Sequence, residues 1–161
     1  SELSSDSSKS IDVVQDILQK CSDSYDYVVL LQPTSPLRNP RDIENMIALI
    51  ESNNADAAVT ISSIDEPHPY KLKTISRSGM ISSFIDGRES ETPRQLLPKV
   101  YALTGAIYIT KTNIILNNKT FLPKKTVPYI MNENINIDSE KDFIYLNIMR
   151  KLNKIKIWGI D

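Results

Sequence analysis

The sequence has few of the residues on which disulfides, metal clusters and histidine-based catalysis depend. Its 161 residues include one cysteine, one histidine, one tryptophan and four glycines. The single Cys21 excludes an internal disulfide, and we expect a buried or half-buried bystander thiol rather than a nucleophile. The lone His68 lacks the partners of a catalytic triad or a zinc site. We therefore expect it to make a turn contact beside the neighbouring prolines.

An excess of one charge and long hydrophobic runs are also missing. Lys and Arg total 19 against 20 for Asp and Glu, so the balance gives no reason to expect a nucleic acid or a membrane surface as partner. No run approaches the roughly 18 apolar residues of a membrane span. These absences favour a soluble protein of a reducing compartment, the cytoplasm. The length, residues 1–161, is that of one domain.

A short apolar run leads into a turn that is stiffened by prolines. Residues 27–31, Tyr-Val-Val-Leu-Leu, indicate a parallel strand covered on both faces. Pro33 and Pro36 then fix the backbone, so Gln32 and Ser35 are held rigidly at the carboxyl end of that strand. Ligands of open α/β sheets bind at such ends. The alternative is an ordinary strand-to-helix connection, the commoner case for these residue types.

Hydrophobic periodicity predicts alternating helices and strands on both sides of this turn. Residues 10–20 and 40–52 repeat apolar side chains at helical spacing, and residues 57–61 form a second apolar run. A strand, a helix and a strand in this order predict a right-handed crossover. A long strand over residues 100–109 contains Gly105, and such a glycine marks a bulge or a close backbone approach to a ligand.

Residues 66–98 and the end of the chain depart from this alternating pattern of helices and strands. Prolines and glycines interrupt residues 66–98, and two short runs joined near Gly79 predict a hairpin that projects from the sheet. The last helix is expected to begin after Ser139, with Asp142 completing an acidic capping box. We expect four of its side chains to face the core: Ile144, Ile148, Met149 and Leu152.

Nine consecutive residues, Leu30-Leu31-Gln32-Pro33-Thr34-Ser35-Pro36-Leu37-Arg38, resemble the signature of the CMP-sialic acid synthetases, also called acylneuraminate cytidylyltransferases. A looser similarity extends from Ser1 to about Leu152. The resemblance implies a mostly parallel, Rossmann-like sheet of the nucleotide-diphospho-sugar transferase type, with helices on both faces. It also implies that residues 66–98 pair with a second subunit in a homodimer.

The activity implied by this resemblance is a nucleotidyl transfer in nucleotide-sugar biosynthesis. An enzyme of this family joins CTP to an acidic nine-carbon sugar, which gives a CMP-activated nonulosonic acid and pyrophosphate, with Mg²⁺ as cofactor. The resemblance places Gln32 and Ser35 in the active-site cleft. It assigns the acidic sugar to three further residues: Lys71, Arg94 and Gln95.

Two positions depart from the pattern of the family. Thr104 stands where the family has a substrate-binding Asn, and its hydroxyl has less reach than an amide. In Asn136-Ile137-Asp138 only the second of two metal-binding Asp residues is kept, so the resemblance leaves Asp138 as the Mg²⁺ ligand. On position alone, capping of the last helix is the commoner role for Asp138.

The sequence also has no counterpart of the glycine-rich, basic loop that holds the triphosphate in this family. Its four glycines are not clustered, and we therefore expect a partial domain that lacks the first βαβ portion and does not turn over alone. Two alternatives stay open. One is a non-catalytic binding or dimerisation module, and the other is a cytidylyltransferase for another keto-acid sugar, such as 3-deoxy-manno-octulosonic acid. The sequence does not identify the sugar or the role of residues 154–161.

Overall fold

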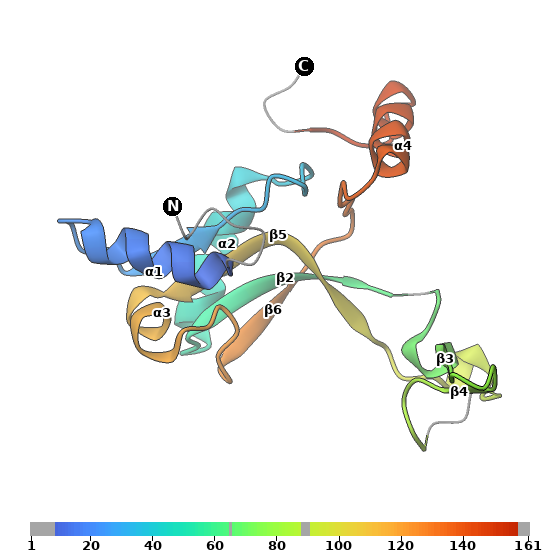
Figure 1. Ribbon diagram of the computed structural model, residues 1–161. Helices are drawn as coiled ribbons and strands as arrows, with labels where there is room; N and C mark the ends of the chain where they lie inside the picture. Colours follow the sequence, from blue (N-terminus) through green and yellow to red (C-terminus); the bar gives the residue numbers. More distant parts are fainter. Residues whose placement is uncertain (1–8, 65, 88–90, 158–161) are drawn as a thin grey trace. The chain divides into compact units, whose positions relative to one another are not determined.

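The computed structural model describes residues 9–64, 66–87 and 91–157 (Figure 1). The chain divides into two compact units. The first contains residues 1–61 and 103–161, and the second contains residues 62–102.

The helices and strands of the first unit alternate along the chain, as the periodicity predicts. They are α1 (Ser10–Lys20), β1 (Tyr27–Leu30), α2 (Pro40–Ser52), β2 (Ala57–Ser63), β5 (Tyr101–Lys111), α3 (Thr112–Asn118), β6 (Thr126–Ile130) and α4 (Glu140–Lys151). The ends of β2 and the start of β5 continue into the second unit. The mixed α/β fold class is therefore confirmed, and none of the described helices is long and apolar enough to cross a membrane.

The four described strands of this sheet lie in the order β1-β5-β2-β6. β2 and β6 are parallel, whereas β1 and β5 are antiparallel with Tyr27 opposite Lys111. The prediction of a parallel pairing for residues 27–31 is therefore wrong for β5. β5 returns from the second unit and enters between β1 and β2, so it runs against β1. Val29 is 37% exposed, so its face of β1 is not covered as predicted.

The turn after β1 ends in a well-capped helix. The side chain of Asn39 accepts a hydrogen bond from the backbone N–H of Arg41 at 2.9 Å, and Asp42 accepts one from the N–H of Asn39 at 3.0 Å. Pro40 occupies the first helical position, where its missing N–H costs nothing. These residues fix where α2 begins relative to the turn.

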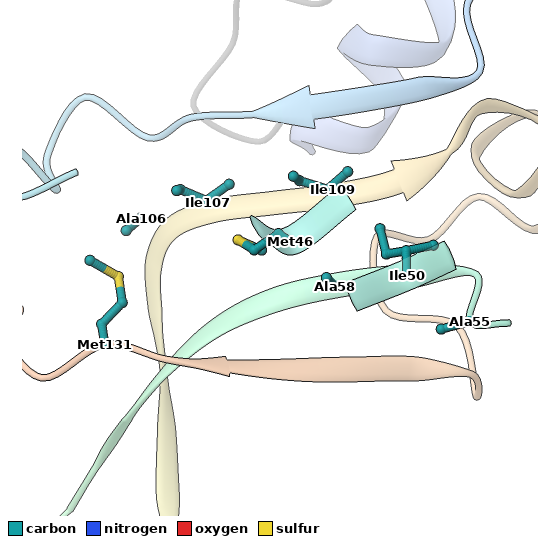
Figure 2. Packing of buried hydrophobic residues seen from close by; sticks show 8 residues of the cluster. All are labelled: Met46, Ile50, Ala55, Ala58, Ala106, Ile107, Ile109 and Met131. Atoms are coloured by element: carbon teal, nitrogen blue, oxygen red, sulfur yellow. The ribbon is translucent and has the colours of Figure 1, made fainter. Parts of the chain in front are cut away.

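The core of the first unit forms where α2 packs against β2 and β5 (Figure 2). Met46 and Ile50 of α2 are fully buried, as are Ile107 and Ile109 of β5. Truncating one such side chain to alanine typically costs about 2–5 kcal/mol, because a cavity is left behind. This packing gives β5 a fixed position, and the site described below depends on that position.

The last helix meets its neighbours through a different face from the one predicted. Ile144, Ile148 and Leu152 are 51%, 49% and 61% exposed, so the prediction that they face the core is wrong. Leu146 is buried instead and packs with Leu37 and Ile155. α4 contacts this small cluster along one narrow stripe, which leaves its other apolar positions uncovered. Met149, by contrast, is partly buried against the same cluster, as predicted. The tail after this helix is described only to residue 157, so Trp158 lies outside the described residues.

The second unit contains the predicted hairpin in shorter form. Its elements are the 3-10 turns η2 (Pro69–Lys71) and η3 (Arg94–Leu96) and the antiparallel strands β3 (Lys73–Ile75) and β4 (Ile81–Ser83). Gly79 lies in the connecting turn at φ +80°, a conformation that glycine adopts without strain. The predicted excursion, residues 66–98, falls inside this unit.

Candidate functional site

The turn after β1 is braced by its own backbone. The carbonyl oxygen of Gln32 accepts hydrogen bonds from the N–H of Ser35 at 3.2 Å and from the guanidinium of Arg38. The side-chain amide of Gln32 is half-buried and makes no hydrogen bond to another described residue. The turn therefore holds Gln32 in place through its main chain and leaves its amide available for a ligand.

Gly105 of β5 supports the side chain of Gln32. Its φ is +73°, and a Cβ built on it would overlap Oε1 of Gln32 and lie 3.3 Å from Cδ. The sequence predicts either a bulge or a close approach to a ligand at this glycine, whereas in the structure its backbone lies close to another part of the protein. The approaching group is a side chain of the turn.

Ser35 ties the turn to two other segments. Its hydroxyl is buried, with the residue 1% exposed, and lies 3.2 Å from the carbonyl oxygen of Thr104 and 3.2 Å from Oδ1 of Asn136. Both of these atoms are acceptors, so they share the single proton of the hydroxyl. Ser35 was predicted to line the cleft, but its burial gives it a supporting position behind the surface.

The segment before α4 is anchored to the same turn. The N–H of Ile137 donates to the carbonyl oxygen of Thr34 at 2.8 Å, and the amide nitrogen of Asn136 donates to Oδ2 of Asp138 at 2.6 Å. Asp138 itself is exposed. The structure therefore brings Gln32, Ser35 and Asp138 to one region of the first unit, as the resemblance implies.

Asp142, and not Asp138, caps the last helix. One oxygen of Asp142, Oδ2, accepts from the hydroxyl of Ser139 at 2.8 Å, from the N–H of Ser139 at 2.8 Å and from the N–H of Asp138 at 3.2 Å. The bond from the Ser139 hydroxyl is the main reason that the pKa of Asp142 is lowered. Because Asp142 performs the capping, the carboxylate of Asp138 is free for another role.

Thr104 occupies a different environment from the one predicted. It is 3% exposed, and its hydroxyl donates to Oγ1 of Thr60 at 2.7 Å and accepts from the N–H of Ala106 at 3.2 Å. A hydroxyl that is buried and bonded within the sheet does not face a ligand. Thr104 is therefore corrected from a substrate-binding residue to a structural one, and its contribution to the site is its carbonyl oxygen.

The remaining predicted residues lie in the second unit. Lys71 and Arg94 line a hollow of about 450 Å³ together with Glu66, Pro67 and His68. Arg94 forms an ion pair with Glu66, and both side chains are largely exposed. Gln95 follows Arg94 in η3 and is exposed, but it does not line this hollow.

His68 makes the turn contact that the sequence predicts. Nδ1 lies 3.2 Å from the N–H of Tyr70, and Nε2 lies 3.0 Å from the carbonyl oxygen of Pro98. Since Nδ1 accepts, the proton resides on Nε2 and is donated to Pro98. The imidazole is 6% exposed and closes the turn, so it is not placed as a catalytic base.

A magnesium ion could be held at Asp138 with the help of substrate oxygens. The described residues contain no group of three or more His, Cys, Asp or Glu side chains suited to a metal. Mg²⁺ is often held by one or two carboxylates together with substrate phosphates and waters. An exposed carboxylate with one oxygen not engaged by Asn136 fits this donor set.

Three features, two in the first unit and one in the second, are not predicted from the sequence. These are the packing of Gly105 on Gln32, the bridge through Asn136 and the ion pair of Glu66 with Arg94. A glycine within a strand signals a bulge or a close approach at residue 105 but does not identify the group that it meets. The other two are contacts between residues distant in sequence or without a motif, so no local pattern predicts them.

No protein-family model matches the chain. Curated proteins, in contrast, match most of its length. The N-acylneuraminate cytidylyltransferase of Streptococcus agalactiae is 33% identical over 147 residues, which is 90% of this chain and 35% of the relative. The CMP-N,N'-diacetyllegionaminic acid synthase of Legionella pneumophila is 31% identical over 159 residues, 95% of this chain and 67% of the relative. The chain thus spans about a third of the length of the streptococcal relative.

A solved structure has the same fold. CMP:2-keto-3-deoxy-manno-octonic acid synthetase, complexed with CTP, matches 92% of this chain and 70% of its own length with a TM-score of 0.60. The sequence identity is 14%, so this likeness concerns the fold alone. Together with the identity and coverage shared with the Legionella protein, the signature from Leu30 to Arg38 identifies the chain as a member of the acylneuraminate cytidylyltransferase family.

Proposed function

We propose that this chain contributes the sugar-activating site of a cytidylyltransferase that joins CTP to an acidic nine-carbon sugar. The observation that carries the proposal is the placement of Gln32. Its amide rests on Gly105, has no hydrogen bond to another described residue, and belongs to the segment that also anchors residues 136–138. The family membership and the names of the relatives support the same reading.

In this reaction the anomeric hydroxyl of the sugar attacks the α-phosphate of CTP. A new P–O bond forms, the bond to the leaving pyrophosphate breaks, and the proton of the hydroxyl passes to solvent or a nearby base. When bound, Mg²⁺ would supply charge neutralisation at the phosphate oxygens, and Asp138 would hold it. Gln32 offers both a donor and an acceptor to orient a substrate.

Lys71 and Arg94 suit the acidic group of the sugar. The planar guanidinium of Arg94 matches a carboxylate with two parallel hydrogen bonds, and Lys71 adds a point charge on the same hollow. Gln95 lies beside Arg94 on the surface and adds a neutral hydrogen-bonding group. The choice of a nine-carbon sugar over an eight-carbon keto-acid rests on the family membership.

Calorimetry separates this proposal from a module that only binds sugar. If the chain belongs to a cytidylyltransferase, the acidic sugar binds more tightly when CTP and Mg²⁺ are present, because the reaction brings the three together. Binding of the sugar that is independent of both would instead indicate a non-catalytic module. A panel of nonulosonic acids and 3-deoxy-manno-octulosonic acid identifies the sugar, and a pyrophosphate-release assay tests turnover by this chain.

A homodimer formed through the second unit is the assembly that we infer. Large apolar side chains are exposed on this unit, among them Ile75 at 77%, Ile81 at 70% and Phe84 at 62%. Burial of such a patch is the usual reason for its presence. Sedimentation of the wild-type chain should give a dimer and that of Ile81→Arg a monomer, whereas equal masses would contradict the inference.

A cytoplasmic location is inferred from the substrates and from the single Cys21. This residue is exposed, contrary to the expectation of a buried thiol, because it follows the last turn of α1 at the surface. An exposed free thiol is compatible with a reducing compartment.

A further inference from the structure

The contacts of Asn136 assign it a role in the site that family membership does not. Resting on the proposed function of Asp138 as the metal-holding carboxylate, we propose that Asn136 is a positioning residue. Its amide fixes the orientation of the Asp138 carboxylate before any cation binds, and Asn136 does not itself coordinate the cation.

The orientation of the Asn136 side-chain amide is the first observation that supports this role. Oδ1 of Asn136 accepts from the buried hydroxyl of Ser35 at 3.2 Å, and Nδ2 donates to Oδ2 of Asp138 at 2.6 Å. The oxygen end, which alone can ligate a cation, is thus turned to Ser35. The nitrogen end faces Asp138, and an N–H donor is no ligand for a hard cation.

The backbone on both sides of this pair is fixed independently. The N–H of Ile137 donates to the carbonyl oxygen of Thr34 at 2.8 Å, and the N–H of Asp138 donates to Asp142 at 3.2 Å. The main chain therefore holds the position of residue 138. The rotation of its exposed carboxylate is left to Asn136, since no other described side chain is hydrogen-bonded to it.

The charge at position 136 has a direct consequence. A neutral donor stabilises the Asp138 carboxylate in one orientation without a cation, whereas a second carboxylate at 136 would repel it. The substitution Asn136→Asp should therefore make the ordering of the Asp138 carboxylate depend on a bound cation. Asp138 would then be ordered only when a divalent cation screens the two charges.

The experiment measures the side-chain rotamer of Asp138 from three-bond couplings in the metal-free protein, and Mn²⁺-induced broadening of the Asp138 amide signal. Wild type and the control Asn132→Ala, an exposed asparagine of the same segment, should show one rotamer. Asn136→Ala should show averaged couplings and an affinity for Mn²⁺ lower by about 10-fold to 100-fold. Asn136→Asp should show averaged couplings that become those of one rotamer when Mg²⁺ is added.

The outcomes test the positioning role of Asn136 and the metal-binding role of Asp138 separately. Averaged couplings in wild type, or unchanged couplings in Asn136→Ala, would overturn the role of Asn136 and leave the proposed function intact. Equal Mn²⁺ broadening in wild type and Asp138→Asn, or none in wild type, would overturn the metal-binding role itself. Asn136→Ser, whose short hydroxyl cannot bridge Ser35 and Asp138, replaces the alanine variant if that variant is unfolded in a thermal melt.

Discussion

The backbone of Gly105 lies against the side-chain amide of Gln32, so closely that no other amino acid fits at residue 105 without moving that amide. Gln32 lies in the turn that follows β1, and Gly105 lies within β5, 73 positions further along the chain. The orientation of the amide therefore depends on a glycine in a distant strand.

Gly105→Ala should destabilise the protein and displace Gln32. The backbone conformation at φ +73° alone costs a residue with a Cβ about 1–2 kcal/mol, and the overlap with Gln32 adds to this cost. Gly79→Ala is the matched control, because its φ is +80° and nothing lies within 4 Å of the added Cβ. Denaturant titration of both variants gives the difference; equal losses would show that the contact with Gln32 has no energetic weight.

Ser35→Ala should cost about 1–3 kcal/mol, because two acceptors lose the proton that they share. The control is Ser63→Ala, at an exposed position at the end of β2. Urea unfolding measures both variants. A loss for Ser35→Ala no larger than that of the control would mean that the buried hydroxyl does not hold the turn to residues 104 and 136.

Thr104→Val tests the correction made to the role of Thr104. The isosteric change removes the hydrogen bond to Thr60 and should lower the free energy of unfolding by about 1–2 kcal/mol. Affinity for the acidic sugar, measured by calorimetry on the folded variant, should stay within about twofold of wild type, a free-energy change of about 0.4 kcal/mol. A larger loss of affinity would restore Thr104 as a ligand contact.

Glu66→Gln should strengthen binding of the acidic sugar. Glu66 pairs with Arg94 and competes with a carboxylate for the same guanidinium. Removing its charge removes this competition for the guanidinium. Arg94→Gln should weaken binding by about tenfold, a loss of about 1.4 kcal/mol. The two variants are compared by calorimetry at low and high salt. An unchanged affinity in Arg94→Gln would exclude Arg94 from sugar binding.

Stability should fall at high pH through Tyr108. Burial raises the pKa of Tyr108 above its ordinary value of 10.0. A raised pKa means that the fold favours the neutral phenol, so the contribution is complete below the unfolded pKa of about 10 and is lost as the pH rises through the folded value. Denaturation at about pH 9 and pH 11 should show a smaller loss for Tyr108→Phe than for wild type. Equal losses of stability in the two proteins would show that Tyr108 does not cause the decrease at high pH.

The parts of the fold that local patterns determine were predictable from the sequence. Helix α1 begins and ends at the predicted residues, and Ser139 and Asp142 mark the start of α4 as predicted. Helical spacing and capping chemistry act within a few residues, which is why both could be read directly.

Contacts between distant segments could not be predicted from such local sequence patterns. The apolar run at residues 27–31 looks like a doubly covered strand, yet its burial depends on what packs on the two faces of the sheet, and Val29 and Leu31 are exposed. The same limit applies to Ile144 and Ile148, whose spacing is correct for a helix but does not reveal which face is covered. The resemblance named Gln32 and Asp138, while the roles of Gly105 and Asn136 required the geometry.

An NMR titration of the ¹⁵N-labelled chain with CMP-N-acetylneuraminic acid and Mg²⁺ tests whether Gln32 and Asp138 belong to a ligand site. We expect saturable amide shifts concentrated at residues 32–35, 105 and 136–138. We also expect an affinity lower by about tenfold, or about 1.4 kcal/mol, in Gln32→Ala but not in Gln19→Ala, an exposed glutamine of α1. Saturable shifts elsewhere on the chain, with Gln32→Ala binding as tightly as wild type, would contradict this ligand site.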